Sequence, residues 1–205
     1  MNLETLNTLQ TEHRCLLGQA AQIGEQLEMI RRGCDPDYSL LHERVEFLKG
    51  HYIEVHCPKD KVMIEKLVGD SGNLGAVMAP FLNAHESAFL ANMREFAAGL
   101  KAVLTERMIS RDHLLRYGDA ALYHLREQVA TEEAGPLPWA RQRLRRRDWK
   151  DVAAANGSAQ QSQVADCASI GYLFPHLDRQ AASAARSRKP SRTALSATAH
   201  RHRDY

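Results

Sequence analysis

Apolar side chains recur along this chain at steps of three and four residues, the period of one face of an α-helix. No stretch alternates apolar and polar residues as a half-buried β-strand does. The helical pattern covers four long segments, 6–27, 40–67, 78–103 and 110–132. Because amphipathic helices joined by short turns pack most simply against one another, the sequence predicts an all-α, up-down four-helix bundle.

Turn-forming residues end the last of these segments, where Gly135 and Pro138 follow the helical pattern. After Pro138 the sequence predicts one or two short helices that cap the bundle and end near Gly157. Further on, Ala, Ser, Gln and Arg dominate, a composition too poor in large apolar side chains to bury a core. We therefore expect a folded domain over residues 1–157 and a largely disordered C-terminal region over 158–205.

Composition and charge narrow the class of protein. The chain is 44% hydrophobic and 25% charged, which is ordinary for a soluble globular protein. Its net charge of +2 gives no strong attraction to nucleic acid, and no apolar run approaches the roughly 20 residues that span a bilayer. The N-terminus lacks a signal-peptide pattern, and the widely spaced cysteines favour free thiols. We expect a cytoplasmic protein with neither membrane nor nucleic acid as its partner.

Polar side chains interrupt the apolar face of every long segment. Residues four apart on an α-helix differ by only about 40° and lie about 6 Å apart along its axis, so they point into the same space. His56 and Asp60 form one such pair, and Gln128 and Glu132 form another. The candidate ligands on the four apolar faces are His13, His56, Asp60, His85, Gln128 and Glu132.

A metal ion gives these residues a reason to converge. Burying a carboxylate costs several kcal/mol unless it is paired, so two acids among histidines in one core need a cation that collects them. Imidazole and carboxylate ligands without an organised thiolate set suit iron, manganese or zinc. The chain holds no Glu-x-x-His and no His-Glu-x-x-His, which argues against a ferritin-type site and a zinc metalloprotease.

Four stretches resemble the hemerythrin-like, or HHE cation-binding, family over roughly residues 5–155. They are "LQTEHRCLL" around His13, "YIEVHCPKDKVMIEKL" around His56, "APFLNAHESAFL" around His85 and "ATEEAGPLPWARQRLRRRDW", which contains Glu132. The resemblance implies a four-helix bundle around a non-haem di-iron centre. It also implies that His13, His56 and Asp60 serve one metal, that His85 and Glu132 serve the other, and that the two carboxylates bridge.

Two positions depart from the family pattern. Asp60 stands where the family has a longer glutamate, and Gln128 stands where the fourth helix of the family has a histidine. An amide oxygen is a weaker iron ligand than an imidazole, and His124 lies one turn before Gln128 on a neighbouring face. The alternatives are therefore a di-iron centre, with or without His124, and a mononuclear site.

The resemblance implies an iron protein that binds or senses a small oxidant, such as oxygen or nitric oxide, or the iron or redox state. Binding is favoured over catalysis, since an oxidase or peroxidase also needs a substrate channel. The alternative is a bundle with a degenerate metal site that acts as a protein-interaction module through its basic C-terminal region. Five arginines in "RQRLRRRDWK" and the basic composition of the tail are the basis of that alternative.

Overall fold

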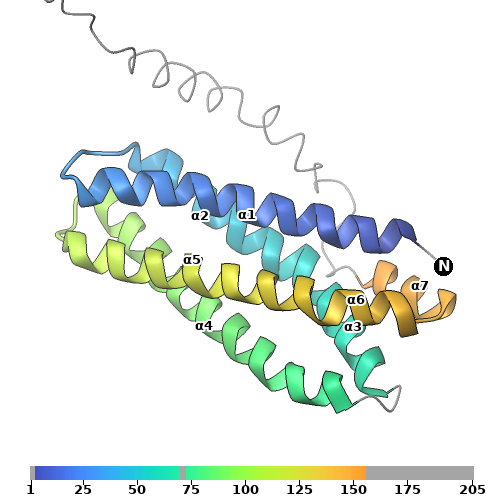
Figure 1. The fold of residues 1–205 in the computed structure, drawn as a ribbon. Coiled ribbons are helices and arrows are strands. Elements are labelled where there is room, and N and C mark those ends of the chain that lie inside the picture. The colour runs from blue at the N-terminus through green and yellow to red at the C-terminus, as the bar shows by residue number, and fades with distance from the viewer. Residues whose placement is uncertain (1–2, 70–72, 156–205) are drawn as a thin grey trace, which may run out of the picture. The chain divides into compact units, whose positions relative to one another are not determined.

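The computed structural model describes residues 3–69 and 73–155, all of which belong to one compact unit, Met1–Val164. These residues form helices and turns and include no β-strand, which confirms the all-α prediction. The predicted C-terminal region, 158–205, lies outside the described residues. The elements in chain order are α1 (Leu3–Arg31), α2 (Tyr38–His51), the π-helical turn η1 (Tyr52–His56), α3 (Cys57–Gly69), α4 (Asn73–Leu104), α5 (Arg111–Ala134), α6 (Pro136–Arg143) and α7 (Arg146–Ala154) (Figure 1).

The sequence specifies where several helices begin and end. The side chain of Asp37 accepts a hydrogen bond from the Leu40 N–H at the start of α2, and Ser110 caps α5 in the same way. At the end of α1, Gly33 adopts a φ of 79°, a left-handed conformation that glycine enters at low cost. The N–H of Cys34 then donates to the Met29 carbonyl, which closes the helix and turns the chain toward α2.

The second predicted helix, 40–67, is divided by η1 into α2 and α3. In η1 the N–H of Cys57 donates to the carbonyl of Tyr52, five residues back, in place of the usual four. Pro58 follows directly, and proline has no N–H to donate and clashes with the carbonyl four residues earlier. A wider π-helical turn just before Pro58 accommodates this clash. Such turns occur often at functional sites, and His56 is the last residue of this one.

Two apolar clusters fill the interior of the described part of the chain. They lie on either side of a polar layer that contains His13, His56 and Glu132. The larger cluster joins α1, α2, α4 and α5 through residues such as Leu16, Leu48, Phe89 and Val129. The smaller joins the first turns of α1 to α3, α6 and α7, where Leu9, Met63, Leu137 and Trp149 are buried. At three places along the chain the polar layer falls between these clusters: His13 lies between Leu9 and Leu16, His56 between Tyr52 and Met63, and Glu132 between Val129 and Leu137.

Cys34 and Cys57 are free, as the wide spacing of the cysteines led us to expect. Among the described residues, none of the helices combines the length and the apolar character needed to cross a bilayer.

Candidate metal centre

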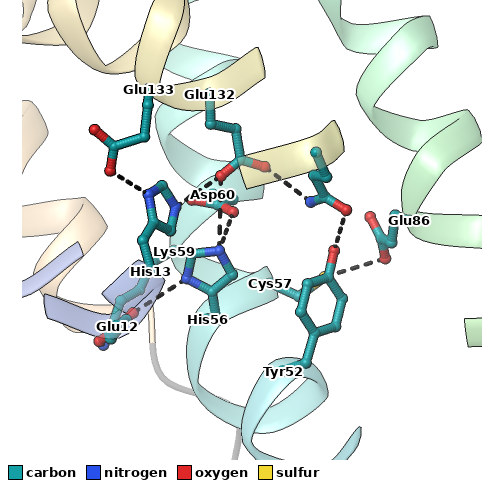
Figure 2. A network of polar contacts seen from close by, with 11 residues as sticks. Glu12, His13, Tyr52, His56, Cys57, Lys59, Asp60, Glu86, Glu132 and Glu133 are labelled. Carbon is teal, nitrogen blue, oxygen red and sulfur yellow. Dashed lines mark hydrogen bonds and ion pairs between the residues drawn. The ribbon is translucent and has the colours of Figure 1, made fainter. Parts of the chain in front are cut away.

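Four ligand-type side chains from three parts of the chain converge in the polar layer. They are His13 of α1, His56 of η1, Asp60 of α3 and Glu132 of α5 (Figure 2). Each offers one ligand atom, and these atoms all lie within 4.8 Å of one another. The residues are at most 7% exposed. This buried group could hold a metal ion, since one ion would reach all four atoms.

The two imidazole rings turn the same nitrogen toward this centre. Nε2 of His13 lies 2.9 Å from Oε2 of Glu132, and Nε2 of His56 lies 2.8 Å from Oδ2 of Asp60. Oε2 of Glu132 is also 3.6 Å from Nε2 of His56, so this oxygen faces both rings. Asp60 lies one turn after His56 on the same helical face, as the sequence predicted.

Several of these ligand atoms make no hydrogen bond within the group, and a cation would give them a partner. The 2.8 Å contact between His56 Nε2 and Asp60 Oδ2 lacks the direction of a hydrogen bond. His56 Nε2 and both carboxylate oxygens of Asp60 are buried and have no hydrogen-bond partner. Buried polar groups without partners are costly and rare in folded proteins. Two imidazole nitrogens and two carboxylates are a donor set that matches the preferences of iron, manganese or zinc.

Protonation of the group shows how its charge is balanced without a metal. Burial acts to lower the pKa of His56, but the contacts with Asp60, Glu12 and Glu132 outweigh it and raise this pKa well above its ordinary value. The pKa of His13 is also raised, because the contact with Glu132 outweighs burial. Two imidazolium groups therefore balance the carboxylates, and one divalent cation could replace their two protons.

The carboxylates differ from each other. Burial, and then the negative charge of Glu132, raise the pKa of Asp60 to about 6, although His56 opposes this. Burial also acts to raise the pKa of Glu132, but the hydrogen bond from His13 and the nearby ring of His56 bring this pKa well below its ordinary value. Glu132 is thus the fixed negative charge of the centre, and Asp60 is the carboxylate that exchanges a proton more readily.

Further carboxylates face the outer nitrogens of the two rings. Nδ1 of His13 lies 2.7 Å from Oε1 of Glu133, and Nδ1 of His56 lies 3.3 Å from Oε2 of Glu12 (Figure 2). Metal-binding histidines generally donate their second N–H to such a group, which fixes the tautomer. The sequence analysis missed both glutamates. Their positions in the sequence could have indicated them, because each lies next to a predicted ligand: Glu12 precedes His13, and Glu133 follows Glu132.

Gln128, a predicted ligand, lies beside the group and takes part in a hydrogen-bonded chain. The Tyr52 hydroxyl donates to Oε1 of Gln128 over 2.7 Å, and Nε2 of Gln128 donates to Oε1 of Glu132 over 2.8 Å. Both polar ends of the amide are therefore engaged. This chain holds Glu132 with its other oxygen, Oε2, directed at the histidines.

His85, the remaining predicted ligand, lies apart from the four-residue group. Its Nδ1 is 3.2 Å from Nδ1 of His124, so one of the two rings donates a hydrogen bond to the other. Both histidines are half-buried, and Phe81 and Tyr123 flank their rings. Within residues 3–69 and 73–155, His85 and His124 belong to no group of three or more metal-ligand side chains.

No protein-family model, no curated protein and no solved structure matches this chain. Fold and site together define an all-α protein with a buried histidine and carboxylate group that could hold a metal ion.

Proposed function

We propose that this chain is a hemerythrin-like, non-haem iron protein that binds or senses a small oxidant such as oxygen or nitric oxide. In this proposal α1, the α2–α3 segment, α4 and α5 are the helices of an up-down bundle around the iron. The observation that carries the proposal is the buried group itself, in which His56 Nε2 and both Asp60 oxygens have no hydrogen-bond partner. The sequence motifs around His13, His56 and Glu132 add support from their resemblance to that family.

The contacts favour one iron per chain over two. A dinuclear centre of the family type needs bridging carboxylates and a second set of ligands. Oε1 of Glu132 accepts a hydrogen bond from Gln128, which leaves only Oε2 to face a metal. His85, the ligand that the resemblance assigns to the second metal, contacts His124 instead. The ligand set is then His13, His56, Asp60 and Glu132.

When bound, an iron ion with a free coordination position supplies the means to bind a diatomic molecule. The chain supplies a rigid, dry surrounding. The ring of Tyr52 packs against His56 and Phe89, and its hydroxyl donates a hydrogen bond to Gln128. The apolar clusters on both sides of the polar layer exclude water, which strengthens electrostatic contacts between the ligands and a cation. Residues Glu12 and Glu133 hold the rings so that both Nε2 atoms point inward.

The metal content of the protein and its absorption in the presence of nitric oxide test the proposal. Full-length protein loaded with ferrous iron under anaerobic conditions and then desalted should retain about one iron per chain. On exposure to nitric oxide it should develop visible absorption bands that the metal-free protein lacks. To exclude any metal held by His200 and His202, the measurement uses the H200A/H202A variant as its background. His56→Ala in that background is the matched control and should retain no iron.

The interaction module is the alternative outcome of the same test. Its supporting observation is the run of exposed basic side chains over α6 and α7, Arg141, Arg143, Arg145, Arg146, Arg147 and Lys150. If neither iron, manganese nor zinc is retained, and if none of them raises the unfolding temperature, the proposed iron function is wrong. The basic surface then becomes the feature to pursue.

A further inference from the structure

Behind His56, on the side away from the centre, lies a buried ion pair that the four ligands do not include. Nζ of Lys59 contacts Oε1 of Glu12, and the other oxygen of Glu12, Oε2, faces Nδ1 of His56 at 3.3 Å (Figure 2). The side chains of Glu12 and Lys59 are only 9% and 8% exposed. The Glu12 carboxylate thus divides its two oxygens between a ligand and a lysine.

Such a pair calls for an explanation other than stability. Removing two charges from water costs several kcal/mol each, and apolar side chains of similar volume often stabilise a fold as well or better. The outer carboxylate of the other histidine shows the contrast. Glu133, which contacts Nδ1 of His13, is 40% exposed, so water screens its charge. Glu12 is buried, and Lys59 neutralises it at the cost of burying a second charge.

The net charge of the buried region becomes zero when a divalent ion is bound. Asp60 and Glu132 contribute two negative charges, and the histidines are neutral when they bind a metal. Glu12 and Lys59 cancel each other. One cation of charge +2 therefore leaves this region neutral, whereas a +3 ion leaves one uncompensated positive charge in a low-dielectric interior.

We propose that Glu12 and Lys59 form a neutral pair that positions His56 and matches the centre to a divalent cation, so that Lys59 lowers the preference for a trivalent ion. The inference rests on the proposed iron function. Glu12 is a positioning residue because it acts through His56. Lys59 acts through its charge alone and contacts no ligand atom that faces the centre.

The midpoint potential of the bound iron tests this inference, since it reports the ratio of ferric to ferrous affinity. Glu12→Gln leaves the positive charge of Lys59 unpaired and should disfavour the ferric ion by about tenfold or more, a rise of about 59 mV for a one-electron couple. Lys59→Met leaves the negative charge of Glu12 and should shift the potential by a similar amount in the opposite direction. The double variant E12Q/K59M is neutral again and should return close to the wild-type potential.

Two further measurements separate the charge effect from a loss of folding. Lys61→Met is the control, because Lys61 pairs with Glu86 and its side chain is 55% exposed; it should leave the potential unchanged. Zinc affinity gives a readout without redox chemistry, and Glu12→Gln should weaken it about tenfold as the support of His56 is lost. A purely structural role would alter unfolding temperatures without shifts of opposite sign in the potential.

The inference is overturned if Glu12→Gln and Lys59→Met both bind iron at the wild-type potential, or if both shift it in the same direction. Should Lys59→Met fail to fold, the isosteric Glu12→Gln decides, because an unchanged or lowered potential contradicts the proposal. If the wild-type protein retains no iron, the proposed function has failed first. Metal content therefore distinguishes that failure from a failure of this inference.

Discussion

Two pairs of histidines lie in the part of the chain that the structure describes, and their surroundings differ. His13 and His56 have ring centroids 4.9 Å apart, and His85 and His124 have theirs 5.3 Å apart. The first pair is almost fully buried and has carboxylates at every ring nitrogen. The second is half-buried, and aromatic rings flank it. Closeness of two imidazoles is therefore common to both, and the carboxylates are what distinguish the first pair.

The carboxylates also reverse the protonation of the rings. Burial alone lowers the pKa of a histidine because it disfavours the charged form. This is the case for His124, whose pKa is lowered by burial and then by the neighbouring His85. In the centre, contacts with acids outweigh burial and raise the pKa of His13 and His56. The first pair thus carries positive charge that a metal can replace, and it lies among the negative charges that a metal needs.

Removing one histidine from each pair tests directly whether only the first pair binds iron, and it should give the largest effect. His56→Ala should abolish retained iron, and it should lower the unfolding midpoint of the metal-loaded protein. The loss from metal linkage is about 2.7 kcal/mol when free metal stands at 100 times its dissociation constant. Equilibrium unfolding in denaturant, with and without metal, measures it. His85→Ala is the matched control and should keep both iron and midpoint near wild type.

If His56→Ala retains iron, His56 is not a ligand and the centre is assigned wrongly. If His85→Ala loses as much iron as His56→Ala, the two pairs belong to one site and the distinction between them collapses.

The pH dependence of metal binding should follow from the raised pKa values. Without metal, the stability that His13 and His56 contribute by being protonated is fully present below about pH 6.5 and is lost as pH rises through their raised folded values. Metal competes with those protons, so its affinity should increase over the same range, by up to about tenfold per pH unit for each proton displaced. Calorimetry in buffers of different ionisation enthalpy counts the protons released.

We expect the gap between the unfolding temperatures of zinc-loaded and metal-free protein to widen as pH rises from about 6 through the raised pKa values of His13 and His56. A gap that stays constant over this range would show that metal displaces no proton from the two histidines. His124→Ala serves as the control variant, because the lowered pKa of His124 leaves that ring neutral in most of this range and its removal should not alter the slope.

Gln128 allows a test of the hydrogen-bonded chain beside the centre. Gln128→Ala removes the acceptor of the buried Tyr52 hydroxyl and the donor to Glu132, and should cost about 1–3 kcal/mol of unfolding free energy. Iron should be retained, because the amide is not one of the four ligands. The double variant with Tyr52→Phe should recover part of the cost, since the stranded hydroxyl is then absent. Denaturant unfolding and metal analysis measure both.

Gln128→His asks whether the chain can bind the second metal that the resemblance to the hemerythrin-like family implies. With His85 held by His124, we expect iron to stay near one per chain. A rise toward two irons per chain, with a new oxo-bridged absorption, would contradict the mononuclear assignment.

The helical period predicted the direction of side chains better than their depth. Tyr52, His56 and Asp60 are buried as their apolar face required, even though the chain passes through a π-helical turn that the period does not contain. On α4 the same reasoning placed His85 on one face with Phe89. Phe89 is fully buried, but Phe81, one turn before His85, is 48% exposed. The period fixes the angle around a helix, and it does not report whether another helix covers that turn.

Partners between helices were the other part that the sequence could not supply. The i to i+4 pair of His56 and Asp60 was predictable because the helical period places both residues on one face of the predicted segment 40–67. The contact of Tyr52 with Gln128 joins residues 76 positions apart, and the contact of Lys59 with Glu12 joins residues 47 positions apart. Such contacts depend on how far one helix is shifted along another, and a single sequence does not encode that shift in any local pattern.

We expect the smallest change in stability and iron content from substitution of His124, the partner of His85 in the second pair. His124→Ala removes a half-buried ring whose hydrogen bond goes to another half-buried ring, so the unfolding free energy should change by no more than about 0.5 kcal/mol. Retained iron and its absorption should match wild type, because about 12 Å of helix axis separates His124 from Glu132, eight residues further along α5. Metal analysis in the H200A/H202A background, beside His85→Ala, measures this directly. Loss of iron from His124→Ala alone would mean that His124 replaces the histidine missing at Gln128. His85 and His124 would then belong to the second metal site of a dinuclear centre. Neighbouring carboxylates would no longer distinguish a pair of histidines that binds metal from a pair that does not.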